Sequence, residues 1–194
     1  MLKGIVKSLR IKQWIKNGFI FAGIIFDRQL FNLPAFLKTT LGFVIFCILS
    51  SSVYYFNDLF DIEADQQHPK KRNRPIASGI IPINSAIGIA VILCTISLSG
   101  AYFLSRSFFI ICALYFSMNL LYSKWLKHIP ILDVMIIAAG FVLRVAAGVS
   151  LIQVERFSPW LYVVTTLISL FIGFGKRRAE LVLLAKGANH HRVV

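Results

Sequence analysis

The chain repeats long apolar segments that are separated by short polar connections. Apolar runs of about 20 residues match the hydrocarbon thickness of a bilayer. Backbone groups in lipid must find their hydrogen bonds within the protein, and the two-residue alternation of a β-barrel is absent, so we expect each run to be an α-helix. The sequence therefore predicts an all-α, polytopic transmembrane helix bundle. The six predicted spans cover residues 17–31, 34–59, 82–104, 108–122, 131–152 and 159–175.

The composition agrees with a membrane protein and argues against a nucleic-acid-binding one. Hydrophobic residues make up 57% of the chain, including 17 Phe, whereas a soluble domain averages about 45–50%. The formal net charge of +13 would suit nucleic acid if the bases shared one soluble face. They lie instead in the connections between apolar spans. We therefore expect an integral membrane protein with no nucleic-acid partner.

The distribution of Lys and Arg predicts an orientation. These bases concentrate in the N-terminal segment up to residue 16, in the connections 60–81 and 123–130, and after residue 175. The remaining connections carry few. Basic connections face the cytoplasm in membrane proteins. We therefore expect a multi-pass protein of the cytoplasmic membrane, with its polar segments and active site on the cytoplasmic side.

An acidic motif follows the second predicted span, at the start of the segment NDLFDIEADQQHPKKRNRPIASG (residues 57–79). Asp58, Asp61 and Asp65 are three and four residues apart, so on a helix they fall within an arc of about 60°. Mg²⁺ usually takes one or two carboxylates together with substrate phosphates. We predict the three aspartates as metal ligands and, with Asn57, as the catalytic residues. The alternative is an acidic helix end that the following Lys and Arg neutralise.

Basic residues follow this motif directly. Pro69 and Pro75 end the helix and favour an extended loop between them. Arg binds phosphate through two parallel hydrogen bonds, and Lys binds it as a point charge. We expect Lys71, Arg72 and Arg74 to turn back over the carboxylates and to bind substrate phosphates.

Other candidate substrate contacts lie in or beside the remaining spans. Arg144 is inside the fifth span, where an arginine faces the bundle interior and is a functional candidate by default. Asp133 lies on the same helix face but roughly 16 Å away, which excludes a simple ion pair between them. Tyr122 is typical of an interfacial anchor as well as of a substrate contact. The bases after the sixth span also fit an ordinary cytoplasmic flank. The further candidates are Lys16, Lys127, Lys176, Arg177 and Glu180.

Several of these segments fit a known pattern. NDLFDIEAD is similar to the NDxxDxxxD motif of the UbiA-type intramembrane prenyltransferase superfamily, and RPIASG to the continuation of that motif. The set KQWIKN, HPKKRNRPIASG, YSKWLK, LDVMIIAAGFVLRVAAG and GKRRAEL resembles the decaprenyl-phosphate phosphoribosyltransferase branch. The resemblance extends over residues 11–192, nearly the whole chain.

The resemblance implies an enzyme. Members of this branch are membrane enzymes that use Mg²⁺ to move 5-phosphoribose from phosphoribosyl diphosphate (PRPP) to a polyprenyl phosphate, with release of diphosphate. The product leads to decaprenylphosphoryl arabinose and cell-wall arabinan. Family members have about nine spans. The resemblance thus predicts one UbiA-like membrane domain over residues 1–194 that lacks the last spans of the family.

One departure from the superfamily pattern bears on the substrate. Many members carry a second aspartate motif, DxxxD, near the end of the sixth span, where this chain has KRRAE. An enzyme that joins PRPP to a lipid phosphate must bind three anionic groups, which Lys and Arg suit. The acceptor phosphate is already ionised, so no general base is required. Three alternatives stay open: a prenyltransferase with an aromatic or quinone-precursor acceptor, a non-catalytic membrane protein such as a transporter, and an inactive truncated member.

Overall fold

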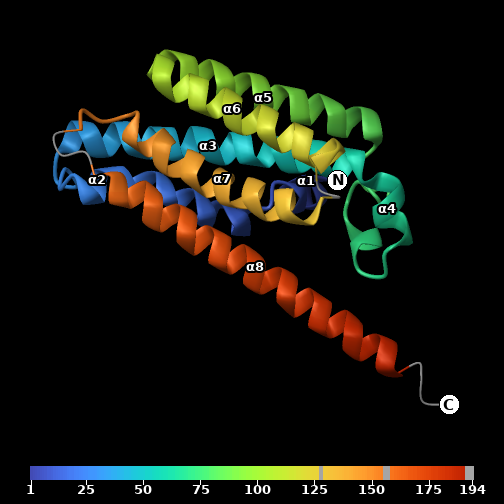
Figure 1. The fold of residues 1–194 in the computed structure, drawn as a ribbon. Coiled ribbons are helices and arrows are strands. Elements are labelled where there is room, and N and C mark those ends of the chain that lie inside the picture. The colour runs from blue at the N-terminus through green and yellow to red at the C-terminus, as the bar shows by residue number, and fades with distance from the viewer. Residues whose placement is uncertain (127–128, 155–157, 191–194) are drawn as a thin grey trace.

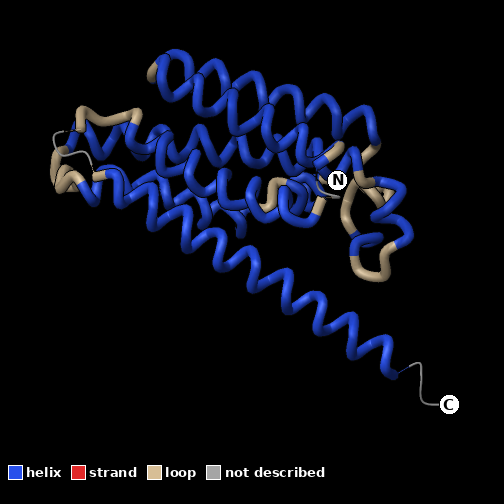
Figure 2. The backbone as a smooth tube through the Cα atoms, viewed as in Figure 1, coloured by secondary structure: helices blue, strands red, loops and turns tan. Residues whose placement is uncertain are grey.

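Long helices dominate the computed structural model, which describes residues 1–126, 129–154 and 158–190. Five helices in this part of the chain are long and apolar enough to cross a membrane. They are α3 (Leu33–Phe60), α5 (Ile83–Leu104), α6 (Arg106–Lys124), α7 (Pro130–Val149) and α8 (Pro159–His190). The five form a bundle from which the second half of α8 projects (Figures 1 and 2). The predicted all-α, polytopic fold is confirmed.

The first predicted span, residues 17–31, is not one long α-helix. The chain forms the 3₁₀-helix η1 (Ile11–Phe21) and then the short helix α2 (Ala22–Phe26). Gly18 and Gly23 lower the α-helical preference of this segment. The described chain therefore has five long spans where the sequence predicts six, and η1 with α2 packs against α7 in the place of the remaining one.

Local sequence signals begin the long helices. The Asn32 side chain accepts a hydrogen bond from the backbone N–H of Ala35 at 3.4 Å, and Pro34 occupies the first turn of α3. Pro130 begins α7 and Pro159 begins α8. Proline suits the first turn because its missing N–H would have no partner there. These signals explain why the observed starts of α3, α7 and α8 lie within a residue of the predicted ones.

Two apolar clusters hold the bundle together. One joins α3, α6 and α7, and the other joins α3 and α5 to the loop that follows α4 (Ile62–Gln67). The first is centred on Phe46, Leu49, Phe108, Cys112 and Leu151. The second is centred on Tyr55, Ile76, Ile81, Ala86 and Ala90. Between membrane-spanning helices such packing stabilises the bundle through van der Waals contacts, because lipid tails are as apolar as these side chains. The second cluster therefore fixes a polar loop to the rigid part of the protein.

The polar segments collect at one end of the bundle. The N-terminus, α4, the start of α7 and the projecting half of α8 all lie toward this end (Figure 1). The N-terminal helix α1 (Leu2–Ser8) contacts the loop after α4, where Lys7 Nζ donates to the Asn73 carbonyl at 3.2 Å. Asn73 closes the short 3₁₀-helix η2 (Lys71–Asn73). The candidate site residues from distant parts of the sequence are thereby brought to one region.

Candidate active site

Two aspartates of the acidic motif share one arginine. Asp58 and Asp65 are 2% and 1% exposed. Arg74 Nη1 donates to Asp58 Oδ1 at 3.1 Å and to Asp65 Oδ2 at 2.6 Å. The predicted convergence of these carboxylates and the predicted return of Arg74 over them are both present. A single cationic atom thus lies between the two buried carboxylates.

The helix that carries the motif is interrupted at its middle aspartate. Asp61 ends α3 and precedes α4, but its N–H still donates to the Asn57 carbonyl at 3.1 Å. The Asp65 N–H donates in turn to the Asp61 carbonyl at 2.8 Å. The helical turn is therefore nearly continuous, which is why side chains seven residues apart still meet. Asp61 is half-buried and lies within electrostatic range of Tyr122.

Arg10 is a site residue that the sequence did not predict. Its guanidinium forms an ion pair with Asp58 and lies over the Tyr54 ring, 4.8 Å from the ring centroid. The backbone of Arg10 is in the left-handed conformation, with φ 52°, which is uncommon for a residue other than glycine. The break between α1 and η1 thus turns this side chain toward the acidic pair.

The other bases of the loop lie elsewhere. Lys71 and Arg72 are exposed on η2, and neither side chain forms an ion pair with a residue that the structure describes. The expected return of all three bases over the carboxylates is therefore observed only for Arg74. Glu63, the remaining carboxylate of this segment, is exposed on α4.

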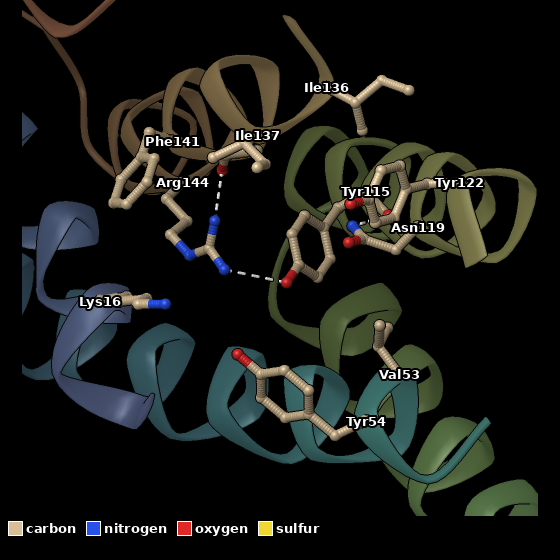
Figure 3. A pocket seen from close by; sticks show the side chains of 11 residues that line it. Lys16, Val53, Tyr54, Tyr115, Asn119, Tyr122, Ile136, Ile137, Phe141 and Arg144 are labelled. Carbon is tan, nitrogen blue, oxygen red and sulfur yellow. Dashed lines mark hydrogen bonds between the residues drawn. The ribbon is translucent and has the colours of Figure 1, made fainter. Parts of the chain in front are cut away.

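A cavity of about 120 Å³ lies beside the acidic pair, one turn of α3 away (Figure 3). Its lining combines two cations, four aromatic side chains, one amide and an apolar wall, and it includes no carboxylate. Three predicted contacts, Lys16, Tyr122 and Arg144, are among these residues. The full lining is Lys16, Val53, Tyr54, Tyr115, Asn119, Tyr122, Ile136, Ile137, Gly140, Phe141 and Arg144.

Neutral groups hold the guanidinium of Arg144, which is 7% exposed. Its Nε donates to Asn17 Oδ1 at 2.9 Å, Nη1 to the Gly140 carbonyl at 2.6 Å, and Nη2 to the Tyr115 hydroxyl at 2.9 Å. Asn17 is oriented because its amide nitrogen donates to Ser50 Oγ at 3.1 Å. No carboxylate among the described residues pairs with Arg144. Its positive charge is therefore fixed in place and uncompensated.

Lys16 adds a second positive charge to the cavity. Partial burial lowers the pKa of its amine, and the charge of Arg144 lowers the pKa further. Lys176 and Arg10 act on Lys16 in the same direction. Predicted Lys176 is thus an exposed base near this cavity rather than a direct part of its lining. Such a concentration of cations favours an anionic ligand.

Asp133 joins three helices at the mouth of the cavity. It is 1% exposed, accepts a hydrogen bond from the Tyr122 hydroxyl, and forms an ion pair with Arg177. Arg177 Nε donates to Asp133 Oδ2 at 2.7 Å. Two predicted substrate contacts, Tyr122 and Arg177, are therefore bound to a carboxylate on α7. Lys127 and the side chain of Glu180, both predicted contacts, lie outside the described residues.

The acidic pair suits a divalent cation by its chemistry. Among the described residues, no three His, Cys, Asp or Glu side chains lie close enough to hold a metal ion by themselves. Mg²⁺ needs only one or two carboxylates, because water and substrate phosphates complete its shell. Asp58 and Asp65 offer two oxygens that already share one cationic nitrogen. These residues therefore fit Mg²⁺, provided that Arg74 moves aside.

Comparison with known proteins identifies the family. The sequence profile described as the UbiA prenyltransferase family matches residues 18–175. The chain belongs to this family. Among its relatives, decaprenyl-phosphate phosphoribosyltransferase of Corynebacterium glutamicum is 36% identical over 184 residues, which are 93% of this chain and 55% of that protein. The enzyme of the same name from Mycolicibacterium smegmatis is 37% identical over 191 residues, which are 94% and 58% of the two chains.

A solved structure supports the fold of this UbiA family member. The UbiA homolog from Archaeoglobus fulgidus, bound to DMAPP and Mg²⁺, superposes with a TM-score of 0.73 at 19% identity. The match covers 86% of this chain and 60% of that one. The chain spans little more than half the length of the two curated relatives above. Family membership and the five candidate spans make it a multi-pass membrane protein.

Proposed function

We propose that this UbiA family member transfers 5-phosphoribose from PRPP to a polyprenyl phosphate and releases diphosphate. The observation that carries the proposal is the cavity lined by Lys16 and Arg144 and by no carboxylate. A donor and an acceptor that both carry phosphate match such a lining. The relatives at 36% and 37% identity are named decaprenyl-phosphate phosphoribosyltransferase, which supports the same choice. The product would enter the synthesis of decaprenylphosphoryl arabinose and cell-wall arabinan.

The acidic motif would hold the diphosphate of the donor. Asp58, Asp61 and Asp65 are the proposed ligands of Mg²⁺, which when bound would neutralise the negative charge of the leaving diphosphate. Asn57 lies half-buried beside them and would donate a hydrogen bond to a phosphate oxygen. The Arg74 guanidinium would then leave the carboxylates to the metal and pair with the negatively charged diphosphate instead.

The exposed bases extend this phosphate site toward solvent. Lys71 and Arg72 carry their charges on η2, next to Arg74 in the sequence, and would meet the donor as it arrives. Lys127, Lys176 and Glu180 remain proposed substrate contacts from the segments around α6, α7 and α8. We place this side of the bundle in the cytoplasm, where PRPP is available.

The transfer itself needs no general base. An oxygen of the ionised acceptor phosphate forms a bond to the anomeric carbon of ribose. The bond from that carbon to the diphosphate oxygen breaks, and its electron pair leaves with the diphosphate. No proton has to be removed from the nucleophile. This agrees with a cavity lining of Lys, Arg, Tyr and Asn that contains no carboxylate or imidazole.

The prenyl tail would lie against the apolar side of the bundle. A groove of about 270 Å³ runs between η1 with α2 and the first turns of α8. Its lining is almost wholly apolar: Phe19, Ala22, Phe26, Trp160, Leu161, Val164, Thr165 and Ile168. A polyprenyl chain that leaves the lipid for this groove would keep apolar surroundings and pack against these side chains through van der Waals contacts. This groove is the proposed tail site.

Transfer of a prenyl group is the competing function within the family. The A. fulgidus homolog is bound to the prenyl diphosphate DMAPP together with Mg²⁺. A prenyl diphosphate and a neutral aromatic acceptor carry fewer phosphates than PRPP and a lipid phosphate. With those two substrates, the positive charges of Lys16 and Arg144 would have no phosphate to bind. We therefore favour phosphoribosyl transfer.

The test is an assay on membranes that contain the chain. Radiolabelled PRPP, decaprenyl phosphate and Mg²⁺ are supplied in one arm, and a labelled prenyl diphosphate with an aromatic acid in the other. We expect label from PRPP to enter the lipid phase, and EDTA to prevent this. The same arms are run on the chain joined to the C-terminal part of the C. glutamicum relative. Transfer of the prenyl group, or of neither group by either protein, would refute the proposal.

A further inference from the structure

Four polar side chains converge on one point of the cavity. The Lys16 ammonium, the Tyr54 hydroxyl, the Tyr115 hydroxyl and the Arg144 guanidinium all point into the same space (Figure 3). They come from η1, α3, α6 and α7, so four different elements place them. Convergent N–H and O–H donors from rigid elements are the arrangement that recognises an oxyanion.

These donors have hydrogens to spare. A guanidinium carries five N–H groups, and the three hydrogen bonds that Arg144 donates leave two N–H groups without an acceptor among the described residues. Over the same part of the chain, neither the Tyr54 hydroxyl nor the Lys16 ammonium forms a hydrogen bond. Lys16 is exposed and Tyr54 is half-buried, so these donors are open to a ligand that enters the cavity. A ligand with several acceptor oxygens would satisfy all of them together.

The cluster of donors and the acidic pair lie at different levels along α3. Asn17 joins Arg144 to Ser50, which lies eight residues before Asp58 on α3. Eight residues of α-helix correspond to about 12 Å. The cavity between these levels is lined by Val53 and Tyr54. The cavity thus presents cations at the level of Arg144, and the carboxylates that suit a metal-bound diphosphate lie outside its lining, about one helical turn beyond Tyr54 on α3.

The deep end is closed by packed side chains. Phe46 and Leu49 are fully buried beyond Arg144, and the Arg144 guanidinium lies over the rings of Phe46 and Phe141 at 5.7 Å and 5.4 Å from their centroids. A prenyl tail could not continue through this core from a phosphate held by Arg144. The group bound there must therefore be terminal, with the rest of its molecule directed toward the mouth.

We propose that Lys16, Tyr54 and Arg144 hold the 5-phosphate of PRPP, while the diphosphate of the same molecule lies at the acidic motif. PRPP carries these groups on opposite sides of its ribose ring, so one molecule would span the cavity. The acceptor's phosphate would then approach the anomeric carbon from the lipid side. This inference rests on the proposed phosphoribosyl transfer and adds the residues that select a 5-phosphorylated donor.

The test compares PRPP with ribosyl 1-diphosphate, which lacks the 5-phosphate, at saturating decaprenyl phosphate. Lys16→Gln and Tyr54→Phe are the variants, because neither side chain has a hydrogen bond to lose within the described protein. We expect each to lower kcat/KM for PRPP roughly 10- to 100-fold. For ribosyl 1-diphosphate, kcat/KM of each variant should stay within about twofold of the wild-type value. Added inorganic phosphite would occupy the empty 5-phosphate site. It should therefore accelerate transfer from ribosyl 1-diphosphate by the wild-type chain and not by the variants.

Lys12→Gln is the matched control, because Lys12 is exposed on the same helix and does not line this cavity. It should leave both donors unaffected. Equal losses on both donors in the Lys16 and Tyr54 variants would overturn the 5-phosphate site. A rise in KM for decaprenyl phosphate alone would assign the cluster to the acceptor and overturn it as well. If the wild-type chain uses no PRPP, the proposed function fails first and this inference with it.

Discussion

Replacement of Gly148 by alanine tests whether the contact between η1 and α7 sets the geometry around Arg144. A Cβ at Gly148 would lie 1.8 Å from the carbonyl oxygen of Ile20, and real Cβ atoms essentially never approach within 3.0 Å. The backbone of η1 would therefore have to move away by about 1.2 Å. Asn17, one turn earlier, would move with it. Its 2.9 Å bond from Arg144 would lengthen to about 4 Å, beyond hydrogen-bonding range.

Two losses combine in this variant. Overpacking against a backbone costs about 1–3 kcal/mol, and a lost hydrogen bond to a charged group costs about 1.5–3 kcal/mol. Movement of η1 relieves the overpacking but breaks the hydrogen bond between Arg144 and Asn17, so the two costs do not simply add. We therefore expect the free energy of unfolding to fall by about 2–4 kcal/mol. Lys16 shifts together with Asn17. Transfer from PRPP should accordingly fall roughly 10- to 100-fold.

The measurement pairs unfolding with turnover. Thermal and denaturant unfolding of the detergent-solubilised protein reports stability, and the labelled PRPP assay reports transfer. Gly18→Ala is the control, because Gly18 lies on the same η1 helix and a Cβ there has no heavy atom within 4 Å. If Gly148→Ala unfolds and transfers like Gly18→Ala, the contact does not position the arginine cluster and the reasoning is wrong.

Three further predictions concern the acidic motif and the mouth of the cavity. Asp58→Ala or Asp61→Ala should reduce transfer at least roughly 100-fold in the PRPP assay, and near-normal turnover with either would contradict the metal assignment. EDTA should stop transfer and excess Mg²⁺ restore it, whereas activity that survives complete chelation would exclude the metal. Asp133→Asn should weaken the anchoring of Arg177 and Tyr122 and lower the free energy of unfolding by about 1–3 kcal/mol. This value lies below the usual cost of breaking a buried pair because the Arg177 side chain is 43% exposed. An unchanged unfolding curve would contradict the role given to Asp133.

The long spans were predictable because hydropathy and proline positions determine them locally. The second predicted span, residues 34–59, corresponds to α3, and the third, residues 82–104, to α5. The first span could not be predicted in the same way. Whether an apolar segment with two glycines becomes an α-helix or a 3₁₀-helix depends on the helix against which it packs. Here, Gly148 of α7 has no side chain, which allows the backbone of η1 at Ile20 to pack closely against α7.

The site shows the same division between local and tertiary information. The spacing of Asp58 and Asp65 is enough to predict that their side chains converge. Arg10 pairs with a residue 48 positions away, and Arg144 bonds to Asn17 across 127 positions, so no local pattern indicates either contact. In the run of bases after α4, only the structure distinguishes Arg74, which turns inward, from its exposed neighbours.

The charge balance of the acidic pair and of the neighbouring cavity favours one class of substrate. At the acidic pair, Arg10 and Arg74 compensate the carboxylates, so a Mg²⁺ ion would replace these arginines as counter-charge and leave them to pair with the diphosphate. At the deep end, Arg144 has no carboxylate partner within the described residues, and burial of such a charge costs several kcal/mol. A neutral acceptor would leave that cost in place through every step of turnover. A phosphate would remove it on binding, and PRPP carries such a group on the far side of its ribose from the diphosphate.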